Sequence, residues 1–260
     1  MQVVSNHGRE TAYVETDSEA DGGTGTALYV HGSGGSHEVW RPQLRLTDRP
    51  ATALDLSGHG HSEDIDASPG YTTRSAYADD VLAVADATDA SVLVGSSLGG
   101  AVVLHVLLER ADEFTPEAVV LTGTGARMGV LEDLLEWLES DFERALEFLH
   151  EPDRLFHDPS SETRERSLEA MRECGQEVTR RDFLTCHDFD VRDRLGEIDV
   201  PVLAAYGEYD QLTPPWFHEY LADEIPDASL AEIEDAAHMP MVEQPRAFDE
   251  AVSEFLASVQ

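Results

Sequence analysis

The run Val92–Gly100 (VLVGSSLGG) constrains the fold of this chain more than any other stretch. Its apolar start is typical of a buried strand, and the apolar spacing of Ala101–Leu108 is typical of a helix that follows at once. Between them, Gly95 and Gly99 stand two residues either side of Ser97, as a turn too tight for flanking side chains requires. Such a turn holds the Ser97 hydroxyl exposed on a strained corner, and strain of this kind usually serves a function. Because Gly-x-Ser-x-Gly is short enough to arise by chance, its meaning depends on what the rest of the chain supplies.

Strand-like and helix-like segments alternate on both sides of this turn. Strands are expected at Thr26–Val30, Ala51–Leu56, Ala118–Leu121, Val200–Tyr206 and Ser229–Ile233, with a weaker edge strand at Glu10–Thr16. A turn rich in Gly, Asp and Ser is expected at Asp17–Gly25, and helical spacing is found at Tyr71–Thr88 and Pro245–Val259. Alternation of this kind predicts the α/β class, with a mostly parallel central sheet flanked by helices on both faces.

The alternation stops between Met128 and Leu195, where no segment resembles a strand. Val130–Leu149 has the apolar spacing of an amphipathic helix, either one bent helix or two, and Glu162–Val178 and Asp182–Leu195 also have helical character. We therefore expect a helical insertion that lies over the sheet. The predicted division is a first core part at residues 1–124, a helical lid at 125–198 and a second core part at 199–260.

The charge of the chain is extreme for a protein of 260 residues. It has 53 Asp and Glu against 17 Lys and Arg, a formal net charge of −36, and every one of those cations is arginine. Self-repulsion at this density destabilises a fold in dilute buffer, whereas concentrated counterions screen it. The composition therefore favours adaptation to a high-salt cytoplasm, as in halophilic microbes, over a generic acidic protein. It disfavours nucleic acids and anionic membranes as partners.

No targeting or membrane-spanning segment is evident in the sequence. Met1–Arg9 lacks a basic segment followed by an apolar core, and no apolar run approaches the length that spans a bilayer. The two cysteines, Cys174 and Cys186, are too few for a disulfide framework, so reduced thiols that are buried or half-buried are expected. We expect a soluble, cytoplasmic protein that is a monomer or a homodimer.

A serine hydroxyl becomes an effective nucleophile only beside a base, normally histidine, that a carboxylate holds in turn. In parallel sheets the working groups lie at the carboxyl ends of the strands. Asp210, which follows Pro201–Tyr206, and His238, which follows Ser229–Ile233, meet that condition. Each residue alone is more often a helix cap or a surface group. Together with Ser97 they supply nucleophile, acid and base in one serviceable chain order, which is much less expected by accident.

The chain resembles the α/β-hydrolase superfamily over nearly its whole length, and four segments carry the resemblance. They are the glycine-rich loop His31–Gly35 (HGSGG), the loop Asp55–Ser62 (DLSGHGHS), the nucleophile elbow Gly95–Gly99 (GSSLG), and Asp210 together with His238–Pro245 (HMPMVEQP). The resemblance implies an α/β-hydrolase fold in which the helical insertion occupies the place of the lid.

The same resemblance assigns roles to individual residues. It makes Ser97 the nucleophile, His238 the general base and acid, and Asp210 the residue that orients the imidazole. An oxyanion hole needs two preorganised N–H donors. The resemblance implies the backbone N–H of Leu98 and one from the glycine-rich loop, that of Ser33 or, less favoured, of Gly34.

Two positions depart from the family's pattern. Ser57 stands where the family usually has proline, and Ala237 stands where glycine commonly precedes the histidine. Both are loop-conformation residues, so they bear on local geometry rather than on the chemistry. Only Ser97 has glycine at both flanking positions, and its neighbour Ser96 is therefore expected to point away from the site.

A serine nucleophile narrows the reaction, because relatives that open epoxides or displace halide use aspartate at this position. The expected reaction is hydrolysis of a small to medium carboxylic ester or lactone through an acyl-Ser97 intermediate, with no cofactor and no metal. C–C bond hydrolysis or cofactor-free perhydrolysis by the same residues is one alternative. A lidded ligand-binding receptor of the same fold is another, since fold does not fix function.

Several side chains of the insertion are candidates for a role in binding. The aromatics either line an acyl pocket or, as is more usual, pack the lid on the core: Trp137, Phe142, Phe148, Phe156, Phe183 and Phe189, with Trp40 in a similar position. His150, His157, His187 and Cys186 fit no common metal-ligand spacing and are expected to be solvated. No catalytic role is assigned to His59 or His61.

Overall fold

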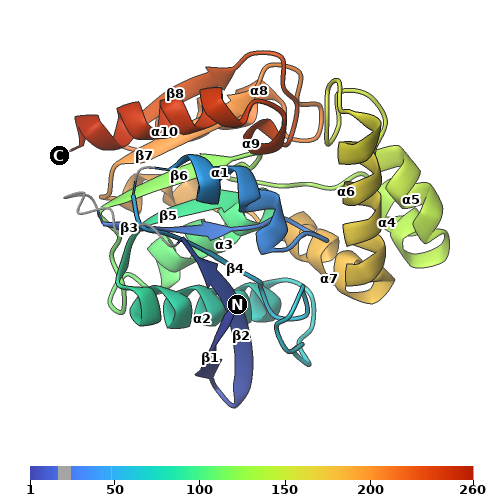
Figure 1. Ribbon diagram of the computed structural model, residues 1–260, viewed down its shortest axis with the longest axis horizontal. Helices are drawn as coiled ribbons and strands as arrows, with labels where there is room; N and C mark the ends of the chain where they lie inside the picture. Colours follow the sequence, from blue (N-terminus) through green and yellow to red (C-terminus); the bar gives the residue numbers. More distant parts are fainter. Residues whose placement is uncertain (17–24, 48, 260) are drawn as a thin grey trace.

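The structure, a computed structural model, describes residues 1–16, 25–47 and 49–259, and an eight-stranded sheet forms its centre (Figure 1). The strands are β1 Gln2–Asn6, β2 Arg9–Glu15, β3 Thr26–Val30, β4 Ala51–Leu54, β5 Ala90–Ser96, β6 Ala118–Thr122, β7 Val202–Gly207 and β8 Ala228–Ile233. Their spatial order is β1-β2-β4-β3-β5-β6-β7-β8. The β1–β2 and β2–β4 pairs are antiparallel and the remaining pairs are parallel, so the predicted mostly parallel sheet is confirmed.

Helices cover both faces of the sheet, as expected. They are α1 Arg41–Leu46, α2 Tyr71–Thr88, α3 Leu98–Glu109, α4 Glu132–Ser140, α5 Phe142–Leu149, α6 Ser161–Cys174, α7 Gln176–His187, α8 Pro215–Glu224, α9 Pro240–Glu243 and α10 Pro245–Ser258, with 3₁₀ turns η1 His37–Trp40 and η2 Arg192–Glu197. Within the described ranges, no helix has both the length and the apolar character needed to cross a membrane.

The core has two halves because side chains alternate across each strand. Leu28 and Leu93 pack on one face with apolar residues of α2, α3 and α8. Tyr29 and Val94 pack on the opposite face with residues of η1 and α10. Strands buried on both faces explain the near-continuous apolar runs in the sequence. The parallel strands end at a common edge, and the loops that follow them converge there.

An antiparallel hairpin, rather than a single strand, forms the edge next to β4. The expected edge strand Glu10–Thr16 corresponds to β2, but β1 covers its outer side and is itself the edge. That expectation was wrong about position because β1, Gln2–Asn6, is short and carries little alternation. The turn expected at Asp17–Gly25 lies outside the described residues, apart from Gly25.

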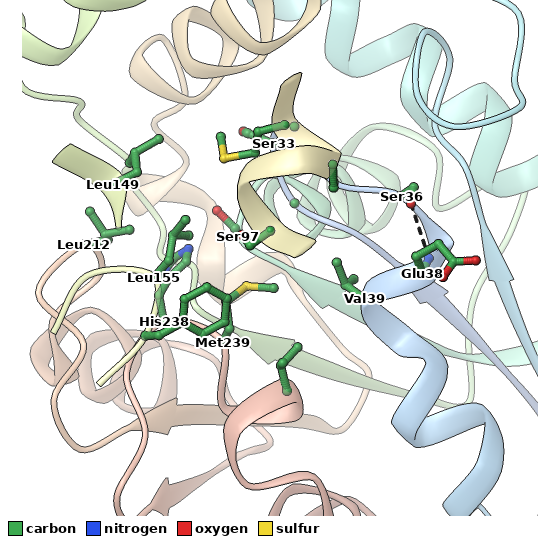
Figure 2. A pocket seen from close by; sticks show the side chains of 18 of the residues that line it. Ser33, Ser36, Glu38, Val39, Ser97, Leu149, Leu155, Leu212, His238 and Met239 are labelled. Atoms are coloured by element: carbon green, nitrogen blue, oxygen red, sulfur yellow. Dashed lines mark hydrogen bonds between the residues drawn. The ribbon is translucent and has the colours of Figure 1, made fainter. Parts of the chain in front are cut away.

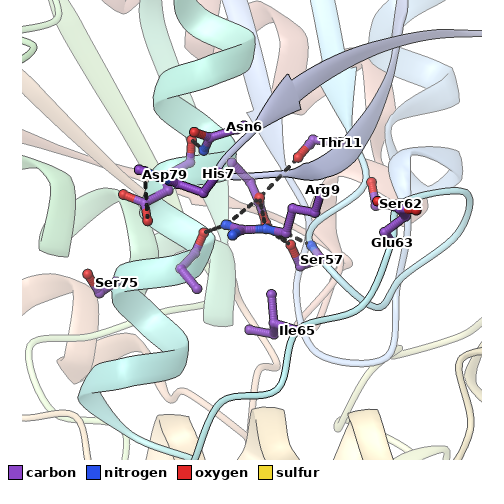
Figure 3. Close-up of polar contacts among 12 residues, drawn as sticks. Asn6, His7, Arg9, Thr11, Ser57, Ser62, Glu63, Ile65, Ser75 and Asp79 are labelled. Atoms are coloured by element: carbon purple, nitrogen blue, oxygen red, sulfur yellow. Dashed lines mark hydrogen bonds and ion pairs between the residues drawn. The ribbon is translucent and has the colours of Figure 1, made fainter.

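A buried polar cluster fastens this hairpin to α2 and to the loop after β4 (Figure 3). Arg9 Nη2 lies 3.1 Å from Asp80 Oδ1, and Ser57 donates its N–H and its O–H to Asp80 Oδ2 over 2.8 and 2.6 Å. Burial raises the pKa of Asp80, and the bonds from Ser57 and Arg9 oppose that rise. Proline, the family's usual residue at position 57, has neither donor. Serine at position 57, where the family usually has proline, therefore supplies two hydrogen bonds to the carboxylate of Asp80.

The helices α4–α7, here called the inserted helices, lie between β6 and β7 and stand at one end of the sheet (Figure 1). The amphipathic stretch Val130–Leu149 forms two helices, which meet at Asp141, and the Asp141 side chain caps α5 by accepting the Arg144 N–H. The next break falls at Gly175, with φ of 87°, so the expected helix bounds around Val178 and Asp182 were misplaced. The inserted helices share a small apolar core of their own: Leu134, Leu138, Ala145, Leu146, Leu149, Leu168 and Met171.

Candidate active site

Ser97 stands at the corner between β5 and α3. Its φ of 53° lies in the left-handed region, which is strained for a residue with a Cβ. The corner is closed tightly, since a Cβ added to Gly95 would lie only 2.6 Å from the carbonyl oxygen of Gly99. The neighbouring Ser96 is fully buried and does not line the cavity beside Ser97. Of the two serines, Ser97 therefore faces the cavity and Ser96 does not, as the glycine spacing predicted.

Asp210 and His238 meet beside this corner. Asp210 lies in the loop after β7 and His238 in the loop after β8, and Asp210 Oδ2 is 2.9 Å from His238 Nδ1. Both side chains are buried, with 2% and 4% relative exposure. Burial opposes the negative charge of Asp210, but His238 and Thr213 outweigh it and lower the pKa of the carboxyl. A proton on Nδ1 shared with Asp210 leaves Nε2 as the basic nitrogen.

Two supporting residues were not found from the sequence. Thr213 donates its N–H to Asp210 Oδ1 over 2.9 Å and its hydroxyl to Asp210 Oδ2 over 2.7 Å. Gly123, with φ of 56°, follows β6, and a Cβ there would lie 3.1 Å from the imidazole Cε1 of His238. Thr213 fixes the carboxylate and Gly123 gives the ring its space. Only the short spacing from Asp210 to Thr213 offered a sequence signal.

The glycine-rich loop after β3 packs directly against Ser97. A Cβ added to Gly32 would lie 2.9 Å from the Cβ of Ser97, so glycine is needed for this approach. The N–H of Gly34 is directed elsewhere, to Asp182 Oδ2 at 3.2 Å. For the N–H groups of Ser33 and Leu98, no hydrogen bond to another described residue is found. Of the two loop donors considered, Ser33 is therefore the one with an N–H available.

Ser97 and His238 line one cavity of about 1160 Å³, which also touches Ser33 (Figure 2). No hydrogen bond joins Ser97 to His238 among the described residues. Apolar side chains form much of the wall, among them Val39, Leu149, Leu155, Leu212 and Met239. A cavity of this kind suits a substrate with an apolar portion.

The inserted helices and the connections between them supply part of this wall. Of the candidate aromatics, Phe148, Phe156 and Phe183 line the cavity. Trp137 and Phe142 instead pack within the inserted helices. Phe189 and Trp40 are almost completely buried in the two halves of the sheet core. Some of these aromatics therefore line the cavity, and the others pack in the interior of the protein.

His37, Asp55 and His61 are side chains of the kinds that ligate metals, and they lie together where His61 and Glu38 line the cavity. Ligand atoms of His37, Asp55 and His61 lie within 4.8 Å of one another. The two oxygens of Asp55 already accept the backbone N–H groups of His37 and His61 over 2.7 and 2.9 Å. His37 Nδ1 lies 2.8 Å from Asp55; burial opposes its charge, but Asp55 and Glu38 raise its pKa. Through these hydrogen bonds the carboxylate of Asp55 joins the segment after β3 to the loop after β4.

The histidines of the inserted helices form no ligand set with Cys186 among the described residues. The expectation that they are solvated was wrong for His150, which is 7% exposed and bonds Leu146 O and Ser167. Cys186 is 3% exposed, which agrees with the expectation of a buried or half-buried thiol, and burial raises the pKa of its thiol to about 12. His157 is half-buried against Asp153. Both cysteines are free, as expected.

Comparison with known proteins identifies the class of this architecture. A solved structure described as a thermophilic esterase matches with a TM-score of 0.84 at 29% identity, and the match covers 99% of this chain and 97% of that one. The class is an esterase-type α/β hydrolase. The chain belongs to the alpha/beta hydrolase family, which it matches over residues 27–251.

Two further relatives show the range of named activities. A pimeloyl-[acyl-carrier protein] methyl ester esterase of Neisseria meningitidis serogroup C is 32% identical over 248 residues, covering 88% of this chain and 93% of the relative. A solved structure described as Est816, an N-acyl homoserine lactone degrading enzyme, has a TM-score of 0.80 at 25% identity and covers 98% of this chain and 100% of that one. The predicted α/β-hydrolase fold and the membership of that superfamily are thus confirmed.

Proposed function

We propose that this protein is a cofactor-independent serine hydrolase that cleaves a small to medium carboxylic ester or lactone. The observation that carries the proposal is the hydrogen-bonded, buried pair of Asp210 and His238, which shares a cavity with Ser97 on its left-handed corner. The esterase and lactone-degrading relatives favour this reaction over the C–C hydrolase, perhydrolase and receptor alternatives.

The first half of the reaction forms an acyl-enzyme. His238 Nε2 takes the proton of Ser97 as Oγ attacks the ester carbonyl carbon, and Asp210 keeps the imidazole in the required tautomer. The carbonyl oxygen becomes an oxyanion that accepts the N–H groups of Ser33 and Leu98. When the C–O bond to the alcohol breaks, His238 returns the proton to the leaving oxygen.

The second half releases the acid. His238 removes a proton from water, whose oxygen attacks the acyl carbon, and the bond to Ser97 Oγ breaks as Ser97 regains a proton. The same two N–H groups stabilise the second oxyanion. For a lactone, the alcohol remains attached to the acyl group and leaves as the hydroxy acid in this step.

The inserted helices act as the lid of the site in this proposal. They and their connections contribute Phe148, Phe156 and Phe183 to an apolar wall that accepts the acyl chain. The acidic surface supports a working environment of high salt and a cytoplasmic location, with small molecules rather than nucleic acids or membranes as partners. In molar KCl we expect higher activity and stability than in dilute buffer.

The proposal is tested by hydrolysis of p-nitrophenyl acetate and butyrate, alongside a short-chain lactone, in molar KCl. Ser97→Ala is expected to lower kcat by at least ~10³-fold, because the nucleophile is lost while binding is kept. Ser96→Ala is the matched control, since it removes a hydroxyl one residue away, and it is expected to retain activity. Equal turnover by Ser97→Ala and the unaltered enzyme would falsify the proposal.

A further inference from the structure

Asp182 is a completely buried carboxylate on α7, one of the inserted helices, and it reaches into the core of the protein. Its Oδ2 accepts the N–H of Gly34 over 3.2 Å and lies 2.8 Å from His59 Nε2. Its Oδ1 accepts the hydroxyl of Tyr77 over 2.7 Å. One side chain of the insertion therefore joins the glycine-rich loop, the loop after β4 and the helix α2.

The electrostatics of this contact are those of a buried ion pair. Burial disfavours a charge on His59, but Asp182 outweighs burial and raises the pKa of the ring well above its usual value. Burial and Asp182 together raise the pKa of the Tyr77 hydroxyl, which stays a donor. Buried pairs of this kind cost desolvation and are weak stabilisers compared with apolar packing. The weak contribution of such a pair to stability favours a further role for Asp182, in the segment that it binds.

What it holds is the backbone that carries the Ser33 N–H. Gly32, Gly34 and Gly35 surround Ser33, and glycine leaves backbone torsions free unless something fixes them. Gly34 has φ of 65°, and its N–H belongs to the peptide that joins it to Ser33. Among the described residues, Asp182 is the one side chain from outside this loop that hydrogen-bonds a backbone N–H of residues 32–35.

We propose that Asp182 is a positioning residue that orients the oxyanion-binding N–H of Ser33 by accepting the hydrogen bond of Gly34. The inference rests on the proposed function, in which Ser33 N–H binds the reacting oxygen. It makes α7 part of the support of the active site as well as a lid element. Because Gly34 needs only an acceptor, the role belongs to the carboxylate as an oxygen acceptor and not to its charge.

The test compares Asp182→Ala with Asp182→Asn, using p-nitrophenyl butyrate in molar KCl under conditions where circular dichroism shows each variant folded. The alanine variant leaves the Gly34 N–H without an acceptor, and kcat is expected to fall by ~10-fold to ~100-fold, less than the ~10²–10³ cost of losing an oxyanion donor outright. KM is expected to stay within ~2-fold, since the contact acts on the transition state. The asparagine variant keeps an amide oxygen for Gly34 and is expected to recover most of kcat.

A trifluoromethyl ketone gives a readout that loss of stability does not move, because it adds to the serine as an oxyanion. Its inhibition constant is expected to rise in Asp182→Ala by the same factor by which kcat falls. Tyr77→Phe is the matched control: it removes another hydrogen bond to Asp182 and leaves Gly34 bonded, so kcat and the inhibition constant are expected to stay within ~2-fold. A folded Asp182→Ala with unchanged kcat, or a Tyr77→Phe that loses as much as Asp182→Ala, overturns the inference.

A second variant covers the case in which Asp182→Ala does not fold. The double change Asp182→Ala with His59→Gln removes both charged partners, so no unpaired charge is left buried. It is expected to show the same loss of kcat, and wild-type kcat in it overturns the inference. The two proposals fail separately. Full activity in Ser97→Ala overturns the proposed function, whereas an inactive Ser97→Ala with an unimpaired Asp182→Ala overturns only the role of Asp182.

Discussion

The inserted helices meet the end of the core that carries Ser97 and His238 at two junctions that are built differently. At the α7 junction, the side chain of Asp182 contacts Gly34, His59 and Tyr77. The loop junction is formed by the connection between α5 and α6, and main-chain groups make most of its hydrogen bonds. There the carbonyl oxygens of Arg154 and Leu155 accept the N–H groups of His238 and Met239, each over 3.1 Å.

A half-buried carboxylate also contributes to the loop junction, but it lies on the core side. Glu243, on the core side, accepts the N–H groups of His157 and Ala237 over 2.7 and 2.8 Å. Burial raises its pKa, while these N–H bonds oppose the rise. Its hydrogen-bond donors are main-chain groups, whereas Asp182 faces an ionisable ring. At the loop junction main-chain groups therefore make most of the hydrogen bonds, whereas at the α7 junction side chains of α7 make them.

The largest expected difference is in stability after the carboxylate at the α7 junction is deleted. Asp182→Ala is expected to lower the free energy of unfolding by about 3 kcal/mol at neutral pH, near the low end for breaking a buried pair, because His59 can lose its proton. Equilibrium denaturation in molar KCl measures this. A loss below about 1 kcal/mol would remove the contrast between the two junctions.

Deleting the carboxylate of the loop junction is expected to cost less. Glu243→Ala leaves main-chain N–H groups of Ala237 and His157 without an acceptor, and we expect a loss of about 2 kcal/mol. Hydrogen exchange of those two amides, followed beside equilibrium denaturation, is the measurement. Exchange should accelerate at both amides. A loss that exceeds the Asp182→Ala value at the same pH would invert the comparison.

The pH dependence of stability separates the charge at the α7 junction from its hydrogen bonds. The pKa of His59 is raised by folding, so its contribution is fully present below about pH 6.5 and is lost as pH rises through the raised pKa. Asp182→Asn removes the charge that causes the rise. The advantage of the wild type over this variant should therefore shrink with rising pH, by up to ~1.4 kcal/mol per unit. Denaturation midpoints over a pH series measure it, and an advantage that grows with pH contradicts the assignment.

The smallest effect is expected where a side chain changes but the main-chain contact remains. At the loop junction the carbonyl oxygen of Arg154 accepts the N–H of His238, while the Arg154 guanidinium lies over the Phe148 ring and donates to Phe148 O. Arg154→Met keeps the carbonyl and an apolar side chain, so stability should change by less than about 1 kcal/mol and kcat should be preserved. Steady-state kinetics and denaturation test this. A tenfold fall in kcat would show that the side chain matters after all.

The sequence was informative where a strand or a fixed turn dictates position. Asp210 and His238 could be placed because strand ends converge, and Ser97 because its glycines permit only a tight corner. Asp182 could not, because α7 carries its polar residues without a clear apolar stripe and its burial depends on how the helix docks. The hydrogen bond between Ser57 and Asp80 could not be predicted for a related reason, since Asp80 lies on a helix distant in sequence.

The central claim is that the Ser97 hydroxyl is the acyl-accepting nucleophile. Labelling the folded protein with a fluorophosphonate in molar KCl, followed by mass spectrometry of the peptides, tests it most directly. One adduct is expected, on Ser97, formed equally in Ser96→Ala and absent from Ser97→Ala. An adduct on another residue, or labelling that persists in Ser97→Ala, would contradict it.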